Sequence, residues 1–295
     1  MSELFGVPMT ALAGQLMLGI INGAFYAILS LGLAVVFGLL NVINFAHGAQ
    51  YMLGALVAWA LLNSWGISYW WSLLLAPMAV GAIGLVLEKF LIARVAYDHR
   101  YGMLVTYGLA LIAQGLVRDH FGAAGLPYSV PEALRGGVDL GFVFAPYYRV
   151  WVVAASLTLC VLTYLCIEKT PLGANLRAAT ENGALAECFG INVKLLSTLT
   201  YGAAVALAAF AGVLAAPMYS VNPVMGADLI IVVFAVVVIG GMGSLSGAVV
   251  AGLGLGIAEG LTKTFYPPAS NIVIFIIMAV VLTLRPAGLF GRDKG

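Results

Sequence analysis

From Leu4 to Leu87 the chain carries no Asp, Glu, Lys or Arg, an uncharged run of 84 residues. Soluble domains contain about 25% charged residues, so a run of this length cannot cover a water-exposed surface. A helix that spans a bilayer needs roughly 20 apolar residues, and this run alone has room for about three. Because lipid cannot hydrogen-bond the backbone, spanning segments are helices or closed barrels. The apolar residues are continuous rather than alternating, which favours helices.

The rest of the chain has the same character, since 63% of its 295 residues are hydrophobic and 8% are charged. We therefore predict an all-α polytopic membrane protein that forms a single transmembrane domain over residues 1–295, with eight or nine crossings and glycine-broken helices. A net charge of +1 gives no electrostatic basis for binding nucleic acid. The predicted apolar runs are residues 10–38, 44–63, 70–90, 101–120, 148–167, 198–219, 228–243, 246–262 and 270–285.

The distribution of Lys and Arg predicts the orientation. Nine of these residues lie in the 88–100 loop, the 168–197 loop and the C-terminal tail, and four lie elsewhere. Basic residues collect on the cytoplasmic side of membrane proteins, so the larger set is predicted to be cytoplasmic. The polar segment 121–147, which contains several prolines and glycines, is then an external loop or a short surface hairpin.

The 168–197 loop has the signals of a helix pair outside the bilayer. Thr170 followed by Pro171 is typical of an N-cap with proline at the first helical position. Gly183 is placed to divide the segment into two short helices, and Gly190 is placed to end the second. An amphipathic pair that protrudes from the membrane suits contact with a partner protein.

Two glycine-broken segments interrupt the apolar sequence, one in each half of the chain: a first segment over residues 37–49 and a second over residues 239–248. Transporters place such breaks around a central path, so one interpretation has the two segments facing each other across a translocation pathway. The alternative is that both are ordinary loops at the cytoplasmic surface. The candidate pathway residues are Asn41, Asn44, His47, Gly48, Gly240, Gly241, Gly243, Ser244 and Ser246.

Single polar residues in these runs have two readings each. His47, the only histidine in the uncharged run, is either a proton relay or ligand contact, or a neutral ring bonded to a backbone carbonyl. Asn41 and Asn44 either line a path or cap helix ends. Glu259 and Lys263, four residues apart, are predicted to form a structural ion pair. GxxxG pairs such as Gly19/Gly23 and Gly252/Gly256 predict close helix packing.

The sequence contains no GxxxxGK[ST] phosphate loop, no HExxH and no GxSxG motif. We therefore expect no catalytic residues, no metal site and no ATP hydrolysis by this chain. A partner then supplies the energy for transport, or the chain acts alone as a secondary carrier or passive channel. An intramembrane enzyme is a third class, for which the isolated His47 is poor support.

With these motifs in order along the chain, the sequence resembles the permeases of branched-chain amino acid ABC importers, specifically the H-type subunit. The resemblance covers nearly the whole chain. The motifs that carry it are Leu-Ala-Val-Val-Phe-Gly-Leu (33–39), Asn-Phe-Ala-His-Gly (44–48), Arg-Ala-Ala-Thr-Glu-Asn (177–182), Gly-Ile-Asn (190–192), Val-Ile-Gly-Gly-Met-Gly-Ser-Leu-Ser-Gly-Ala (238–248) and Leu-Arg-Pro-Ala-Gly-Leu-Phe-Gly (284–291).

The resemblance implies a permease in a bacterial inner membrane, surrounded by membrane lipid and paired with a second, M-type permease. It also implies two cytoplasmic ATPase subunits, which hold the ATP and Mg²⁺, a periplasmic solute-binding protein, and no cofactor on this chain. The 181–190 segment then corresponds to the loop that seats on the ATPase. Its candidate residues are Arg177, Glu181, Asn182, Ala184 and Gly190.

The sequence departs from the family pattern in this loop. Glu181 is followed by Asn-Gly before Ala184, and position 174 is Ala where the family often has Arg. Related permeases look like carriers of amino acids, urea, short amides and organic acids. No residue of the apolar path favours leucine over urea as the solute.

Overall fold

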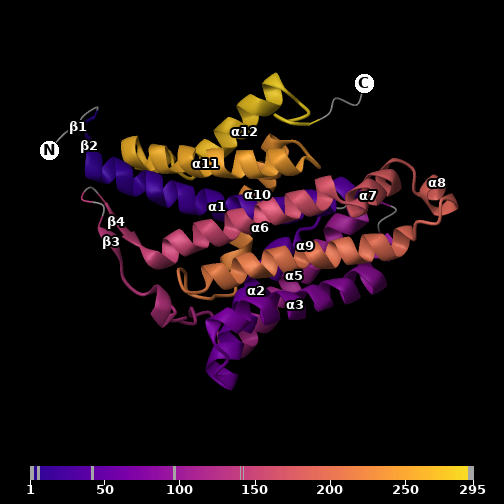
Figure 1. Cartoon of the computed structure of the whole chain (residues 1–295), viewed down its shortest axis with the longest axis horizontal. Helices are drawn as coiled ribbons and strands as arrows, with labels where there is room; N and C mark the ends of the chain where they lie inside the picture. Colours follow the sequence, from indigo (N-terminus) through magenta and orange to yellow (C-terminus); the bar gives the residue numbers. More distant parts are fainter. Residues whose placement is uncertain are drawn as a thin grey trace. The chain divides into compact units, whose positions relative to one another are not determined.

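The computed structural model describes residues 3–4, 7–40, 43–95, 98–139, 141 and 143–291, and each predicted apolar run coincides with a helix (Figure 1). The prediction of an all-α membrane protein is confirmed at this level. The helices that match the runs are α1 (Met9–Leu40), α2 (Ala46–Trp65), α3 (Tyr69–Leu87), α5 (His99–Phe121), α6 (Tyr147–Lys169), α9 (Val193–Ala215), α10 (Met225–Gly240), α11 (Leu245–Phe265) and α12 (Val273–Leu284).

Among the described residues, five helical segments are long and apolar enough to cross a bilayer: Met9–Gly38, Tyr69–Val95, Tyr147–Lys169, Val193–Ala215 and Leu245–Phe265. Helices α10 and α12 are apolar but shorter. A full bilayer needs roughly 20 residues of helix, so these two lie below the usual length. The expected eight or nine crossings remain a prediction.

The segment between α5 and α6 contains the short hairpin that the sequence allowed. Strands β3 (Gly137–Asp139) and β4 (Phe144–Pro146) pair antiparallel, with Val138 opposite Ala145. At the turn Gly141 has φ +80°, and the Asp139 side chain accepts its amide at 2.9 Å. A second two-stranded pair, β1 (Glu3–Leu4) with β2 (Val7–Pro8), precedes α1. The side of the membrane on which these hairpins lie remains a prediction.

The chain forms two compact units, with divisions that fall inside α1, between α5 and α6, inside α6 and inside α10. The first unit comprises Met1–Leu31, Val130–Val161 and Val232–Gly295, and the second comprises Gly32–Ser129 and Leu162–Ile231.

In the first unit α1 lies alongside α11 (Figure 1), and glycines set how closely they approach. A Cβ atom built on Gly19 lies 2.6 Å from the Gly256 carbonyl oxygen, and one built on Gly23 lies 3.0 Å from Leu253 Cα. Small residues allow membrane helices to gain dispersion energy through direct backbone contact. The glycine pairs of both helices therefore serve packing, as the sequence predicted.

The same helix pair carries an ionic contact. Lys263 Nζ lies 2.5 Å from Glu259 Oε1, which confirms the predicted pair on α11. The hydroxyl of Tyr26 on α1 donates to the other carboxylate oxygen of Glu259 at 2.7 Å. The carboxylate thus links the two helices, which the i, i+4 spacing did not indicate.

In the second unit α9 packs against both α2 and α3 through small residues. A Cβ on Gly54 of α2 lies 2.3 Å from the Ala209 carbonyl oxygen, and a Cβ on Gly212 of α9 lies 2.0 Å from the Tyr51 carbonyl oxygen. On the α3 side, a Cβ on Gly84 lies 2.8 Å from the Val205 side chain. At these glycines, the interfaces of α9 with α2 and α3 have no space for a larger side chain.

Candidate functional site

The first glycine-broken segment, residues 37–49, includes the end of α1 and the start of α2, and the described residues 43–45 between them are not helical. Asn41 lies outside the described residues. Asn44 is buried, and its Oδ1 accepts the backbone amide of Ala46 at 3.0 Å. A side-chain oxygen that binds the amide two residues on replaces a missing helical bond at the start of α2. The Asn44 side chain therefore orders the helix start, one of its two expected roles.

A buried polar cluster extends from this helix start to α5 and α9 within the second unit. Asn44 Nδ2 donates to Gln50 Oε1 at 3.3 Å, and Gln50 Nε2 donates to the Tyr201 hydroxyl at 3.0 Å. Thr106 of α5 accepts the amide of Phe45 at 3.2 Å. Buried polar groups are costly unless they are hydrogen-bonded, and this cluster satisfies several of its own groups.

Sequence reasoning did not select Gln50, Thr106 or Tyr201. Gln50 carried a usable signal, because it lies on α2 one turn beyond His47 in an otherwise apolar stretch. Tyr201 lies 151 positions further along the chain, and no local pattern connects it to Gln50.

His47 has no solvent exposure and lies between α1 and α9 within the second unit. A Cβ on Gly32 lies 3.0 Å from the His47 ring and 3.1 Å from the Ala204 carbonyl oxygen, so Gly32 makes the room for the imidazole. Gly48 meets the start of α10, where a Cβ on Gly48 lies 2.3 Å from the Gly226 carbonyl oxygen. Both residues are enclosed by neighbouring helices, and their predicted pathway role remains a prediction.

The second glycine-broken segment is a tight turn between α10 and α11 in the first unit. Gly241 and Gly243 have φ +100° and +84°, a backbone region that glycine adopts without strain. Ser244 caps α11, because its Oγ accepts the Gly247 amide at 3.1 Å. Gly240 packs directly against Gly247, and Ser246 is exposed. This geometry accounts for the glycines as a helix-to-helix turn.

The C-terminal segment closes onto this turn. The amide of Leu289 donates to the Ile239 carbonyl at 2.8 Å, and the amide of Phe290 donates to the Gly240 carbonyl at 3.1 Å. A Cβ on Gly288 lies 2.5 Å from Gly241 Cα. The motifs at residues 238–248 and 284–291, which are far apart in the sequence, therefore pack against each other in the structure.

The two glycine-broken segments belong to different compact units. Their expected position on opposite sides of a pathway remains a prediction.

The 168–197 loop forms the two predicted helices, α7 (Pro171–Glu181) and α8 (Gly183–Cys188). Thr170 is the N-cap residue and Pro171 stands in the first turn, as predicted, although the Thr170 hydroxyl bonds to the Cys166 carbonyl instead of α7. Asn182 separates the helices and caps the second, accepting the Leu185 amide at 3.0 Å. The break therefore depends on Asn182 as well as on the predicted Gly183.

Both ends of the helix pair are fixed by local contacts. Arg177 forms an ion pair with Glu168 at 3.3 Å, which ties α7 to the end of α6. Gly190 has φ +83°, and its amide and that of Ile191 donate to Glu187 and Ala186 at 3.0 and 3.1 Å. These two bonds form a Schellman motif, so the predicted role of Gly190 as a helix stop is confirmed.

The helix pair α7–α8 presents apolar side chains at its surface. Phe189 is 80% exposed, and Leu172 and Leu185 are also exposed. Glu181, Asn182 and Ala184 lie exposed beside them. Apolar groups next to charged and polar groups are typical of a surface that binds another protein.

Comparisons with known proteins agree on one family. The profile described as "Branched-chain amino acid transport system / permease component" matches residues 15–282. The chain is 32% identical to the permease LivH of Escherichia coli, over 95% of this chain and 96% of LivH. It is 31% identical to BraD of Pseudomonas aeruginosa, with the same two coverages. Its identity to the permease LivM of Escherichia coli is 29%, over 91% of this chain and 68% of LivM.

Proposed function

Because the chain belongs to the branched-chain amino acid transport permease family, and so is the non-catalytic membrane component of an ABC transport system, we propose that it forms half of a translocation pathway. The resemblance inferred from the motifs is thereby confirmed. The other half is an M-type permease. The match of this chain to LivM as well as LivH supports this pairing, because related chains offer related surfaces.

The helix pair α7–α8 is the proposed contact with the two ATPase subunits, which act as the motor of transport. Two cytoplasmic ATPase subunits, which bind ATP and Mg²⁺, close on nucleotide binding and press on this pair. The exposed Phe189 and Leu185 are the apolar contacts, and Glu181 and Asn182 are polar neighbours. The ion pair between Arg177 and Glu168 supports the transmission of movement, because it connects α7 to α6.

Transport then follows from a shift between two permease conformations. The motor must bind one conformation more tightly than the other, since a ligand with equal affinity for both shifts nothing. A periplasmic binding protein delivers the solute from the other side, where the 121–147 segment is placed. In this proposal both compact units form one permease domain, and the two glycine-broken segments line its path.

The observation that carries the proposal is the exposed Phe189 at the end of a helix pair with local capping hydrogen bonds. The test is co-purification of the two ATPase subunits with the full permease pair. Phe189→Asp is expected to reduce recovery of ATPase at least tenfold, because it places a charge in an apolar contact. Phe144→Asp is the matched control, since Phe144 is an exposed phenylalanine on the β4 strand of the segment placed externally. Equal ATPase recovery with both variants contradicts the proposed contact.

The side of the membrane has its own test, because Cys188 at the end of α8 is exposed. In a Cys166→Ser background, a membrane-impermeant maleimide is expected to label Cys188 in inside-out vesicles and not in right-side-out vesicles. Labelling from the outside would place α7 and α8 on the wrong face for a motor.

A further inference from the structure

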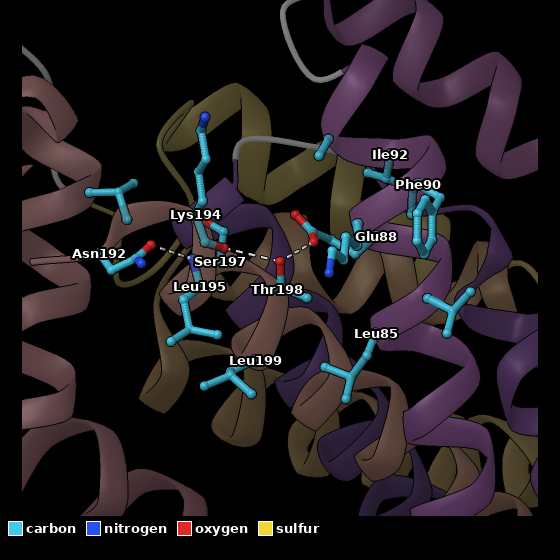
Figure 2. A pocket seen from close by; sticks show the side chains of 14 residues that line it. Leu85, Glu88, Phe90, Ile92, Asn192, Lys194, Leu195, Ser197, Thr198 and Leu199 are labelled. Carbon is cyan, nitrogen blue, oxygen red and sulfur yellow. Dashed lines mark hydrogen bonds between the residues drawn. The ribbon is translucent and has the colours of Figure 1, made fainter.

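A cavity of about 870 Å³ opens on the second unit where α3 ends and α9 begins (Figure 2). Its walls come from the last turn of α3, the π-helix Glu88–Ile92 that continues it, and the first two turns of α9. Both helices are candidate spans, Tyr69–Val95 and Val193–Ala215, so the cavity lies at the ends of two membrane-spanning segments.

Most of the wall is apolar and faces outward. Val86, Phe90, Leu195 and Leu199 line the cavity and are each more than half exposed. Exposed apolar side chains on a spanning helix can face lipid tails at no cost in free energy, because the tails are as apolar as the side chains. The exposed apolar part of the lining therefore suits contact with a lipid acyl chain.

Two cations stand at the same cavity. Lys89 and Lys194 line it, both are exposed, and within the described part of the chain neither ammonium group forms an ion pair. Lys89 Nζ lies 5.7 Å from the centre of the Phe90 ring, which holds it at the rim. In Figure 2 Lys194 reaches the upper end of the view, and Leu195 and Leu199 lie below it.

The one carboxylate of the lining is withdrawn from this rim. Glu88 is 5% exposed, and its side chain accepts the hydroxyl of Thr198 on α9 (Figure 2). Glu88 and Ile92, four residues apart on the π-helix, are buried, while Lys89 and Phe90 between them are exposed. Even with Glu88 ionised, two positive charges face one negative charge.

We propose that this cavity is a binding site for one anionic phospholipid, such as phosphatidylglycerol, from the leaflet on the same side of the membrane as the helix pair α7–α8. The phosphate group binds Lys89 and Lys194, and an acyl chain lies along Leu195 and Leu199. Charge complementarity selects the headgroup, since lysines at a membrane interface attract anionic lipids and extend their ammonium groups to the headgroup level. The first turn of α9 adds a favourable dipole for the phosphate.

The site has a consequence for coupling that rests on the proposed function. Helix α9 follows α8 directly, and α8 packs against α9. A lipid bound between the π-helix and the first turn of α9 therefore holds the base of the helix pair α7–α8.

Native mass spectrometry of the delipidated full-length chain tests the site, with phosphatidylglycerol and phosphatidylcholine of the same acyl composition as probes. The wild-type chain is expected to prefer phosphatidylglycerol, and equal binding of both lipids overturns the proposal without any variant. Lys89→Gln and Lys194→Gln are each expected to lower the preference about fivefold, given about 1 kcal/mol per basic residue at an anionic surface.

Controls separate a specific site from general charge and from misfolding. Lys169→Gln removes an exposed lysine at the end of α6, outside the cavity, and is expected to keep the preference. The double variant Lys89→Arg with Lys194→Arg keeps both charges and is expected to keep it as well. An equal loss in all three glutamine variants indicates non-specific attraction and overturns the site. Because the isolated chain is used, failure here leaves the ATPase co-purification test unaffected.

Discussion

The side-chain amide of Gln50 donates a 3.0 Å hydrogen bond to the hydroxyl of Tyr201, although 151 positions separate the two residues. Both side chains are buried, so the bond replaces water for each of them. It joins α2 to α9 at a level where both helices otherwise present apolar or small residues.

Tyr201→Phe is expected to lower the free energy of unfolding by about 1 kcal/mol, because the Gln50 amide group loses its acceptor in an apolar interior. Thermal unfolding of the purified full chain in detergent measures the change. Tyr164→Phe removes the same hydroxyl from an exposed position on α6 and is expected to leave the transition in place. Similar shifts for both variants would show that the bond adds nothing.

Glycine substitutions on two helices of the second unit are expected to have opposite signs. A Cβ on Gly212 meets the Tyr51 carbonyl oxygen at 2.0 Å, so Gly212→Ala forces α2 and α9 apart at a cost of about 1 to 3 kcal/mol. A Cβ on Gly108 of α5 meets nothing within 4 Å, so Gly108→Ala is expected to raise helix stability by roughly 0.5 to 1 kcal/mol. Chemical denaturation of both variants checks the signs, and a neutral Gly212→Ala would contradict the close packing.

The ion pair between Glu259 and Lys263 predicts a non-additive result. Lys263→Met removes the cation beside the buried Glu259 carboxylate, which keeps its hydrogen bond from Tyr26. This change is expected to destabilise the chain by about 1 to 2 kcal/mol after allowance for the partly exposed lysine. Adding Glu259→Gln removes the unpaired charge and is expected to recover part of that loss. Thermal unfolding of the single and double variants measures the coupling. If the double variant is less stable than Lys263→Met, the unpaired charge on Glu259 is not the cause of the destabilisation.

The contact between the C-terminal segment and the α10–α11 turn gives a local prediction. Gly241→Ala introduces a side chain at φ +100° and within 2.4 Å of the Gly291 amide nitrogen. The segment is expected to detach, which exposes the amides of Leu289 and Phe290 to hydrogen exchange. Gly254→Ala on α11 is the control, because a Cβ there meets nothing within 4 Å. Unchanged exchange at Leu289 in the Gly241 variant would contradict the closure.

Sequence patterns were sufficient to predict the class of protein, the positions of its helices and the pair of short helices in the 168–197 loop. These features depend on sums over neighbouring residues, such as the uncharged run to Leu87, or on short signals such as Thr170-Pro171 and Gly190. Contacts between residues far apart in the chain became visible in the folded structure. Tyr201 reaches Gln50, the tail reaches Gly241, and Glu88 turns to Thr198 because packed helices bring these residues together. The periodicity of a single helix does not indicate which residue of a distant helix it will contact.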